Sequence, residues 1–309
     1  MTISKVEGAE KYELRKKVKK WLIIPAQQSL CSGYKITKIM LRPYDFRITA
    51  YPNKIGFIVD PNEISKHVTY KDNIVLGITS EIAEDNFTHV LISNYMIDFN
   101  CMKSYSSKVK LIPCYRYTKN GIEGNINPKF TNKIELMCNA NIGLDFSEAD
   151  VFSYICAILY SPMYRKKYAP LLKNNNSEIR NYPRIPVLSE DKFFALVKLG
   201  EELIDICLLK DTKLNKSVKF NGNGDYVVSD ITYDKNKLYI NSGQYFSGVT
   251  QDVYDTCIGR CRVISDWLTA RKNRKLSEDE IRYITKVIKA LIRIPEIQRQ
   301  IDEVIGAFV

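Results

Sequence analysis

Residues 265–281 read SDWLTARKNRKLSEDEI and join a tryptophan and a run of bases to a well-marked helix start. Ser277 and Glu280 form a Ser-x-x-Glu capping box, in which each side chain satisfies a backbone N–H at the start of the helix. The following residues place apolar side chains at helical spacing, which predicts a helix docked on the body of the protein. These apolar residues are Ile281, Ile284, Val287, Ile288, Leu291 and Ile292. We therefore expect a basic turn at the mouth of a docked helix.

The bases around this turn have two interpretations. A run of charge is more often a solvated face than a binding site, but clustered bases also neutralise the phosphates of a nucleic acid. The run consists of Arg260, Arg262, Arg271, Lys272, Arg274 and Lys275, with Asp266 as its one acid. Spacing alone leaves both interpretations open.

The bulk composition favours an acidic partner. The chain has 309 residues, enough for one large or two modest domains, and carries a net charge of +11. Its pI is near 9.1. Such a charge fits nucleic acid, an anionic membrane surface or an acidic protein. No apolar run approaches the roughly 18 residues that span a bilayer, and the N-terminus lacks the apolar segment of a signal peptide, so we expect a cytoplasmic protein.

No catalytic, metal or cofactor motif is apparent. The eight cysteines contain no Cys-x-x-Cys pair, and the only histidines are His67 and His89, so we expect neither a metal site nor disulfides. A P-loop and a nucleophile elbow are both absent. The stretches 127–130 and 161–164 each lack the second proline of an amino-methyltransferase loop. A degenerate methyltransferase or nuclease is therefore the weaker hypothesis, and we expect no catalytic residue in this chain.

The pattern of elements predicts a mixed α/β (α+β) fold. Up to about residue 145 the chain is rich in short strand-like runs, after which helices begin at Ser147 and Ser189. Pro162 ends the first of these helices, and Pro295 is expected to break the last one. We predict an N-terminal basic helix and junction over 1–37, a mixed α/β domain over 38–250, and a C-terminal helical part over 251–309.

Four stretches, in order, resemble motifs of the type ISP restriction-modification enzymes. The second stretch has Tyr160 where the family usually has His, and the first has Leu41 where the family has Tyr. In the fourth, Arg260 and Cys261 replace Gly-Tyr. The stretches are LRPYDFRITAY (41–51), DVFSYICAILYSPMYRKKYAPLLK (150–173), YPRIPVL (182–188) with FALVKLGEELIDICLL (194–209), and IGRCRVISDWLTARKNRKLSEDEIRYITKVIKAL (258–291).

The resemblance covers only the C-terminal target-recognition part of these bacterial enzymes. It implies that this chain recognises a specific sequence in duplex DNA and directs an N6-adenine methyltransferase and an endonuclease to it. The methyltransferase flips its target base out of the duplex. The nuclease, helicase-like ATPase and methyltransferase parts would act in cis or in trans, and would take the S-adenosylmethionine, ATP and Mg²⁺. The alternative is a basic protein-interaction subunit of a restriction-modification or defence complex without its own sequence readout.

Site residues follow from this reading in three groups. The expected phosphate contacts are Arg271, Lys272, Arg274, Lys275, Arg260, Arg165, Lys166 and Lys167. Base readers are expected in loops 103–108, 116–120, 173–181 and 219–225, at Lys103, Tyr105, Lys108, Arg116, Lys119, Asn221 and Asn223. Structural roles are expected for Arg42, Asp45 and Arg47 as an ion-pair cluster, for Pro43 in the same motif, for Arg184 between two prolines, and for Trp267 as a core anchor.

Overall fold

The computed structural model describes residues 35–51, 63–68, 72–79, 86–103, 108–138, 146–172, 184–210, 214 and 217–306. Three predictions lie outside these residues. They are the N-terminal basic helix, the base reader Tyr105, and the base-reading loop at 173–181.

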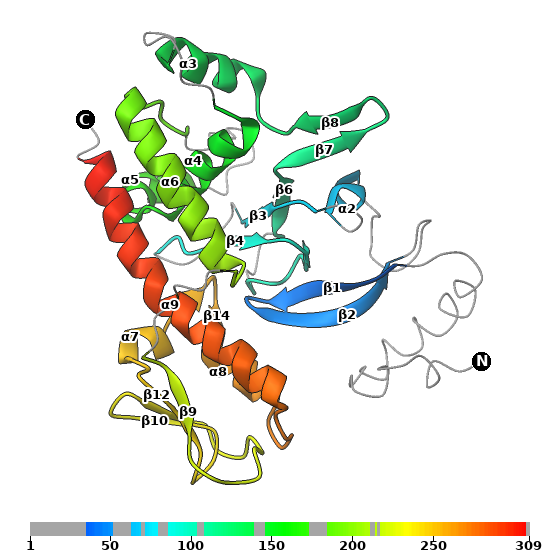
Figure 1. Cartoon of the computed structure of the whole chain (residues 1–309), viewed down its shortest axis with the longest axis vertical. Helices are drawn as coiled ribbons and strands as arrows, with labels where there is room; N and C mark the ends of the chain where they lie inside the picture. The colour runs from blue at the N-terminus through cyan, green and yellow to red at the C-terminus, as the bar shows by residue number, and fades with distance from the viewer. Residues whose placement is uncertain are drawn as a thin grey trace.

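The fold is mixed α+β, as predicted (Figure 1). None of the helices among the described residues is long and apolar enough to cross a membrane. The helices are α2 (Glu63–Val68), α3 (Pro128–Cys138), α4 (Glu148–Tyr160), α5 (Pro162–Leu172), α6 (Glu190–Cys207), α7 (Gln251–Tyr254), α8 (Val263–Thr269) and α9 (Glu278–Ile305). The strands are β1 (Lys35–Arg42), β2 (Asp45–Tyr51), β3 (Val75–Ile78), β4 (Val90–Ser93), β5 (Met96–Ile97), β6 (Lys110–Pro113), β7 (Tyr115–Thr118), β8 (Gly121–Gly124), β9 (Lys219–Asn221), β10 (Thr232–Asp234), β11 (Lys237–Tyr239), β12 (Tyr245–Ser247), β13 (Cys257–Ile258) and β14 (Cys261–Arg262).

The described strands form small, mostly antiparallel sheets. β1 pairs with β2 and, in parallel, with β5, while β3 lies between β4 and β6. A four-stranded sheet has the order β10-β11-β12-β9, and β7 and β8 form a separate hairpin. Strands β10 and β11 are joined by a two-residue hairpin turn, in which Lys235 and Asn236 both adopt a positive φ.

Helix α9 contributes to two hydrophobic cores, and its two halves lie beside different groups of elements (Figure 1). Its first half contributes Ile284, Val287, Ile288 and Leu291 to a core shared with the β9–β12 sheet and α8. Its second half packs with α4 and α6 through Ile297, Ile301 and Ile305. A third cluster lies under β1, β5 and β6. The division at residue 250 stays a prediction, and the core around α8 draws residues from both sides of it.

The expected helix break at Pro295 is wrong. Helix α9 runs without interruption from Glu278 to Ile305, with Pro295 exposed on its surface. A proline inside a helix costs about 3 kcal/mol, because it removes one backbone hydrogen bond and crowds the preceding turn. Apolar residues on both sides of Pro295 are buried in the two cores, and this burial offsets the cost. The capping box of Ser277 and Glu280, in contrast, starts the helix as predicted.

Two of the described helices fall in the half of the chain that we expected to be β-rich. Helix α3 begins at Pro128, where proline is favoured as the first helical residue, and the Asn127 side chain accepts a hydrogen bond from the Lys129 N–H at 3.0 Å. The stretch 127–130 is therefore a helix start and not a loop. Helix α2 is shorter and packs beside β6 and β7.

Gly200 allows α4 and α6 to cross in close contact, and we predict that Gly200→Ala destabilises the fold. A Cβ at this position would lie 2.0 Å from the backbone carbonyl oxygen of Ser153, which cannot move away as a side chain can. We expect the free energy of unfolding to fall by about 1–3 kcal/mol or more in urea titrations. Glu201→Ala, on the exposed next residue, is the control and should change it by less than about 0.5 kcal/mol. Equal effects of the two variants would contradict the close crossing.

Candidate nucleic-acid interface

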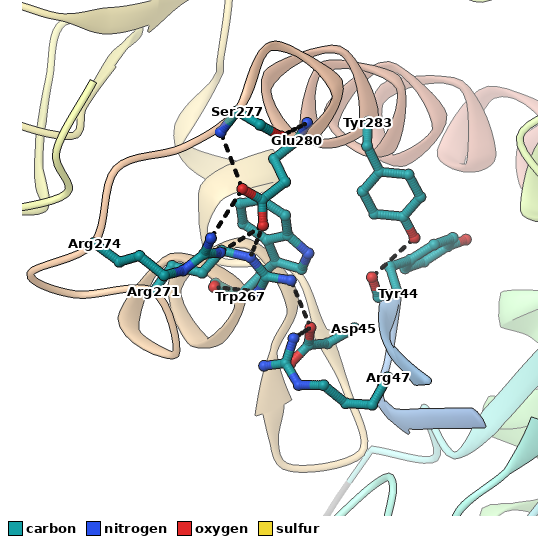
Figure 2. Close-up of polar contacts among 9 residues, drawn as sticks. All are labelled: Tyr44, Asp45, Arg47, Trp267, Arg271, Arg274, Ser277, Glu280 and Tyr283. Atoms are coloured by element: carbon teal, nitrogen blue, oxygen red, sulfur yellow. Dashed lines mark hydrogen bonds and ion pairs between the residues drawn. The ribbon is translucent and has the colours of Figure 1, made fainter. Parts of the chain in front are cut away.

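A buried ion pair connects the β1–β2 turn to the basic segment that follows α8. The Arg271 guanidinium donates from Nη2 to Oδ1 of Asp45 at 2.9 Å, and both side chains are almost fully buried (Figure 2). Arg47 donates to the other Asp45 oxygen at 3.1 Å. A buried carboxylate is tolerated only when it is paired and hydrogen-bonded, and Asp45 meets both conditions.

Arg271 is surrounded on its other sides as well. It donates from Nη1 to the Trp267 carbonyl at 2.9 Å and from Nε to Glu280 at 3.3 Å. Its Cζ lies 3.5 Å from the centroid of the Trp267 ring, a cation–π contact. Burial lowers the pKa of Arg271, and Asp45 opposes that shift. We name Asp45, Trp267, Arg271 and Glu280 the Arg271 clasp.

The clasp corrects one predicted site residue. The basic run predicts Arg271 as a phosphate contact, but its guanidinium is enclosed by Asp45, Trp267 and Glu280 and only 6% of the residue is exposed. Arg271 therefore has a structural role. Trp267 is buried as expected for an anchor, and its ring stacks on Tyr283, whose hydroxyl donates to the Tyr44 carbonyl at 2.9 Å.

Glu280 links the clasp to the exposed bases. Besides capping α9, its carboxylate accepts hydrogen bonds from both Nη atoms of Arg274, at 2.5 and 3.1 Å, and from the Ser277 N–H at 3.0 Å (Figure 2). Burial acts to raise the pKa of Glu280, but the bonds from Arg274 and Ser277 outweigh it, and the pKa lies below its ordinary value. The start of α9 is thus fixed relative to Arg271.

The basic loop 272–275 packs against a second loop through backbone hydrogen bonds. The Asn273 N–H donates to the Val228 carbonyl at 2.7 Å, and the Val228 N–H donates to the Arg274 carbonyl at 3.1 Å. The Leu276 N–H donates to the Tyr226 carbonyl at 2.9 Å. The Lys275 ammonium lies 5.8 Å from the centroid of the Tyr226 ring. These bonds hold an expected phosphate-contacting segment beside the expected base-reading loop 219–225.

The second loop, residues 222–228, has a fixed backbone and several exposed side chains. Gly222 has a φ of +92°, and a Cβ there would lie 2.0 Å from the carbonyl oxygen of Gly243, so only glycine fits. The buried Gln244 accepts from the Tyr226 N–H at 2.8 Å. Asn223 is exposed and makes no side-chain hydrogen bond within the described part of the chain. We name the exposed residues Asn223, Tyr226, Lys272, Arg274 and Lys275 the C-terminal patch.

Asn221 differs from Asn223. Its side-chain amide donates to the Lys219 carbonyl and to the Ser247 hydroxyl, both at 2.9 Å. Both N–H donors of its side-chain amide are thus occupied within the β9–β12 sheet. The structure leaves Asn223 as the better placed of the two expected asparagine readers.

The other expected phosphate contacts are not among the residues of the C-terminal patch. Arg165 is turned inward: its Nε donates to the Leu159 carbonyl at 2.6 Å, and its Cζ lies 4.9 Å from the centroid of the Tyr160 ring. Burial lowers the pKa of Arg165 to about 10. Because its Nε is bonded to a backbone carbonyl and its guanidinium lies over the Tyr160 ring, the geometry favours a structural role for Arg165 over the expected phosphate contact. Lys166 and Lys167 are exposed on α5, and Arg260 is exposed in the turn between β13 and β14.

The remaining expected base readers occupy two further places. Lys103 donates to Asp266 at 2.7 Å, and Lys108 is exposed near the ring of Phe99. Arg116 and Lys119 lie on the β7–β8 hairpin, where Arg116 forms a 3.6 Å ion pair with Glu123 between two exposed side chains.

The expected structural residues are placed as follows. Pro43 is buried beside Asp45, whereas Arg42 is half-buried and makes no ion pair with Asp45 among the residues that the structure describes. Arg184 is exposed, and its carbonyl accepts from the Tyr164 hydroxyl at 3.4 Å. Over the described ranges, no group of three or more His, Cys, Asp or Glu is placed to hold a metal ion.

Comparison with known proteins identifies the class of this domain. Residues 7–297 match the model of the Type ISP C-terminal specificity domain. The chain therefore belongs to that family. No curated protein sequence matches it.

Three solved structures share the fold. A nuclease-deletion mutant of the Type ISP restriction-modification enzyme LlaGI, in complex with a DNA substrate mimic, is 20% identical with a TM-score of 0.62, over 89% of this chain and 25% of that one. The ATP-dependent Type ISP enzyme LlaBIII bound to DNA is 17% identical with a TM-score of 0.65, over 90% and 19%. The DrdV–DNA complex is 16% identical with a TM-score of 0.66, over 96% and 31%. This chain thus spans less than a third of the length of each.

We predict that Arg271→Met destabilises the fold far more than Arg274→Met. Methionine keeps the apolar stem over Trp267 but leaves the buried Asp45 with only the partly exposed Arg47, and breaking a buried pair costs about 3–5 kcal/mol. Arg274 shares Glu280 but is about half exposed, so its loss should cost at most about 1 kcal/mol. Urea denaturation of both variants measures the difference, and similar losses would argue against the clasp.

The lowered pKa of Glu280 predicts a pH dependence. A carboxylate whose folded pKa lies below its unfolded value, roughly 4.3, stabilises fully above that pH and loses this contribution as the pH falls through the folded pKa. The stability difference between the wild type and Glu280→Gln should therefore shrink as the pH is lowered from 7 towards 3 in thermal melts. A difference that stays constant over this range would contradict the assignment.

Proposed function

We propose that this chain is the target-recognition part of a Type ISP restriction-modification enzyme and reads a sequence in duplex DNA. The observation that carries the proposal is the C-terminal patch, where a basic loop and an exposed polar loop, about fifty residues apart in sequence, are bonded side by side. The family match and the three structural relatives, each solved with DNA or a DNA substrate mimic, support it. Duplex DNA in a bacterial cytoplasm would be the partner.

The patch divides the work between two kinds of contact. Lys272, Arg274 and Lys275 bind phosphates and set the register of the domain on the duplex, which carries no sequence information by itself. The side-chain amide of Asn223 has the donor and acceptor that match N7 and N6 of adenine in the major groove. The ring of Tyr226 stacks on the ring of Phe220, with 6.0 Å between the ring centroids, and this contact supports the loop between Phe220 and Tyr226. Arg274 also keeps its bonds to Glu280, so it contributes less than the two lysines.

The chain itself supplies no chemistry in this proposal. Methylation and cleavage belong to methyltransferase, ATPase and nuclease domains in cis or in trans, and S-adenosylmethionine, ATP and Mg²⁺ belong to those domains. The role of this chain is to place them at a chosen site.

Selection from a random duplex library at two salt concentrations tests this function. We predict that the 309-residue chain enriches an asymmetric sequence whose preference survives the higher salt. If no sequence is enriched and the affinity falls steeply as the salt concentration rises, the chain binds DNA only through its basic surface. That result would contradict sequence recognition.

Variants of the patch separate its two kinds of contact. Lys272→Ala with Lys275→Ala should weaken binding evenly across sequences and reduce the salt slope by about 2, whereas Asn223→Ala should relax the preference at one position by about 1–3 kcal/mol. Lys198→Ala with Arg299→Ala, two exposed bases outside the patch, is the charge-matched control for the lysine pair. A control as damaging as the patch variant would contradict the placement of the contact.

A further inference from the structure

The β7–β8 hairpin is fixed at its root by buried side chains. The Asn73 amide donates to the carbonyls of His67 and Tyr115 at 3.1 and 2.7 Å, and its oxygen accepts from the Tyr115 N–H at 3.2 Å. The Nδ1 of His67 accepts from the Tyr117 N–H at 2.8 Å, and the Tyr117 ring stacks on the His67 ring. The first strand of the hairpin is therefore held to α2 and to the segment before β3.

The far half of the same hairpin is exposed. All residues from Thr118 to Glu123 are exposed, and the ribbon extends beyond α2 (Figure 1). Its turn is closed locally, because the Thr118 hydroxyl accepts from the Asn120 N–H at 3.2 Å and donates to the Gly121 carbonyl at 3.3 Å. Ile122, paired across the ribbon with Tyr117, is 66% exposed.

This combination indicates an element presented to a partner. A two-stranded ribbon is marginally stable in water by itself, and an exposed isoleucine forgoes the stabilisation that burial would give it. Here the hydrogen bonds of the buried Asn73 amide hold the base of the hairpin in place. The tip of the hairpin is exposed and is not stabilised by burial against the rest of the domain. Lys119 is exposed at the tip, and Arg116 is the only other base on the ribbon, against Glu123 as its one acid. The ribbon is therefore net positive and fits a polyanion.

We propose that the β7–β8 hairpin enters the major groove of the recognised duplex and that Ile122 contacts the C5-methyl group of a thymine. The inference rests on the proposed function and adds a second reading element to the C-terminal patch. The major groove admits a two-stranded ribbon, and the thymine methyl is its apolar feature. The Lys119 ammonium and the Asn120 amide, exposed at the turn, reach base edges beside it.

Single replacement of each thymine by deoxyuridine in the selected duplex tests this contact, because deoxyuridine lacks only the methyl group. For the wild-type chain, we expect one position at which the change weakens binding about three- to five-fold, the effect of one buried methyl group. Ile122→Ala should bind the thymine duplex about as weakly as the wild type binds the deoxyuridine duplex, and should not respond to the replacement. Leu136→Ala, which removes an exposed apolar side chain on α3, is the matched control and should behave as wild type.

Several outcomes would overturn the inference. A selected site without thymine, no sensitive position in the wild type, or an unchanged response in Ile122→Ala each contradicts a methyl contact while leaving sequence-specific binding intact. Absence of any duplex binding by the wild type would instead overturn the proposed function. Because Ile122 is exposed, the variant should melt at the wild-type temperature, which shows that a lost response is not a loss of fold.

Discussion

The buried ion pair between Asp45 and Arg271 is the constraint on which the rest of the structure depends. It joins residues 226 positions apart, and both charges are removed from water, so each must keep its partner. Trp267 covers the guanidinium and Glu280 extends the network to the first turn of α9. The clasp thereby fixes the β1–β2 turn, α8 and the start of the longest helix relative to one another. The basic loop 272–275 leaves the body directly from this fixed point.

The structure separates residues that hold the fold from residues that can bind a partner. Buried polar side chains hold the exposed loops in place through hydrogen bonds. Arg271 fixes the start of the basic loop, Gln244 fixes the loop that carries Asn223, and Asn73 fixes the β7–β8 hairpin. In each case the backbone is held while the outer side chains are exposed. Exposed side chains on such loops can change without a cost in packing. Helix α9 couples these parts, because it is packed into two cores at once.

Local signals in the sequence predicted much of the fold but little of the site. The capping box at Ser277 involves residues three positions apart, so it can be recognised in the sequence alone. The change from strands to helices near Ser147 can be recognised in the same way. The uninterrupted helix through Pro295 depends on burial in two cores, which no local pattern shows. The burial of Arg271 has the same cause, because its partner Asp45 is distant in sequence. The amide of Asn73 gives no signal at all before the fold is known.

The central claim is that the C-terminal patch lies on DNA, and site-directed cross-linking tests it most directly. Variants with a photoreactive amino acid in place of Lys275 or of Lys198 would be irradiated with the selected duplex. The account predicts a strong cross-link from position 275, at one or two nucleotides of the recognised sequence, and little from position 198. Equal cross-links from both positions, or none from position 275 while the chain still binds the duplex, would contradict it.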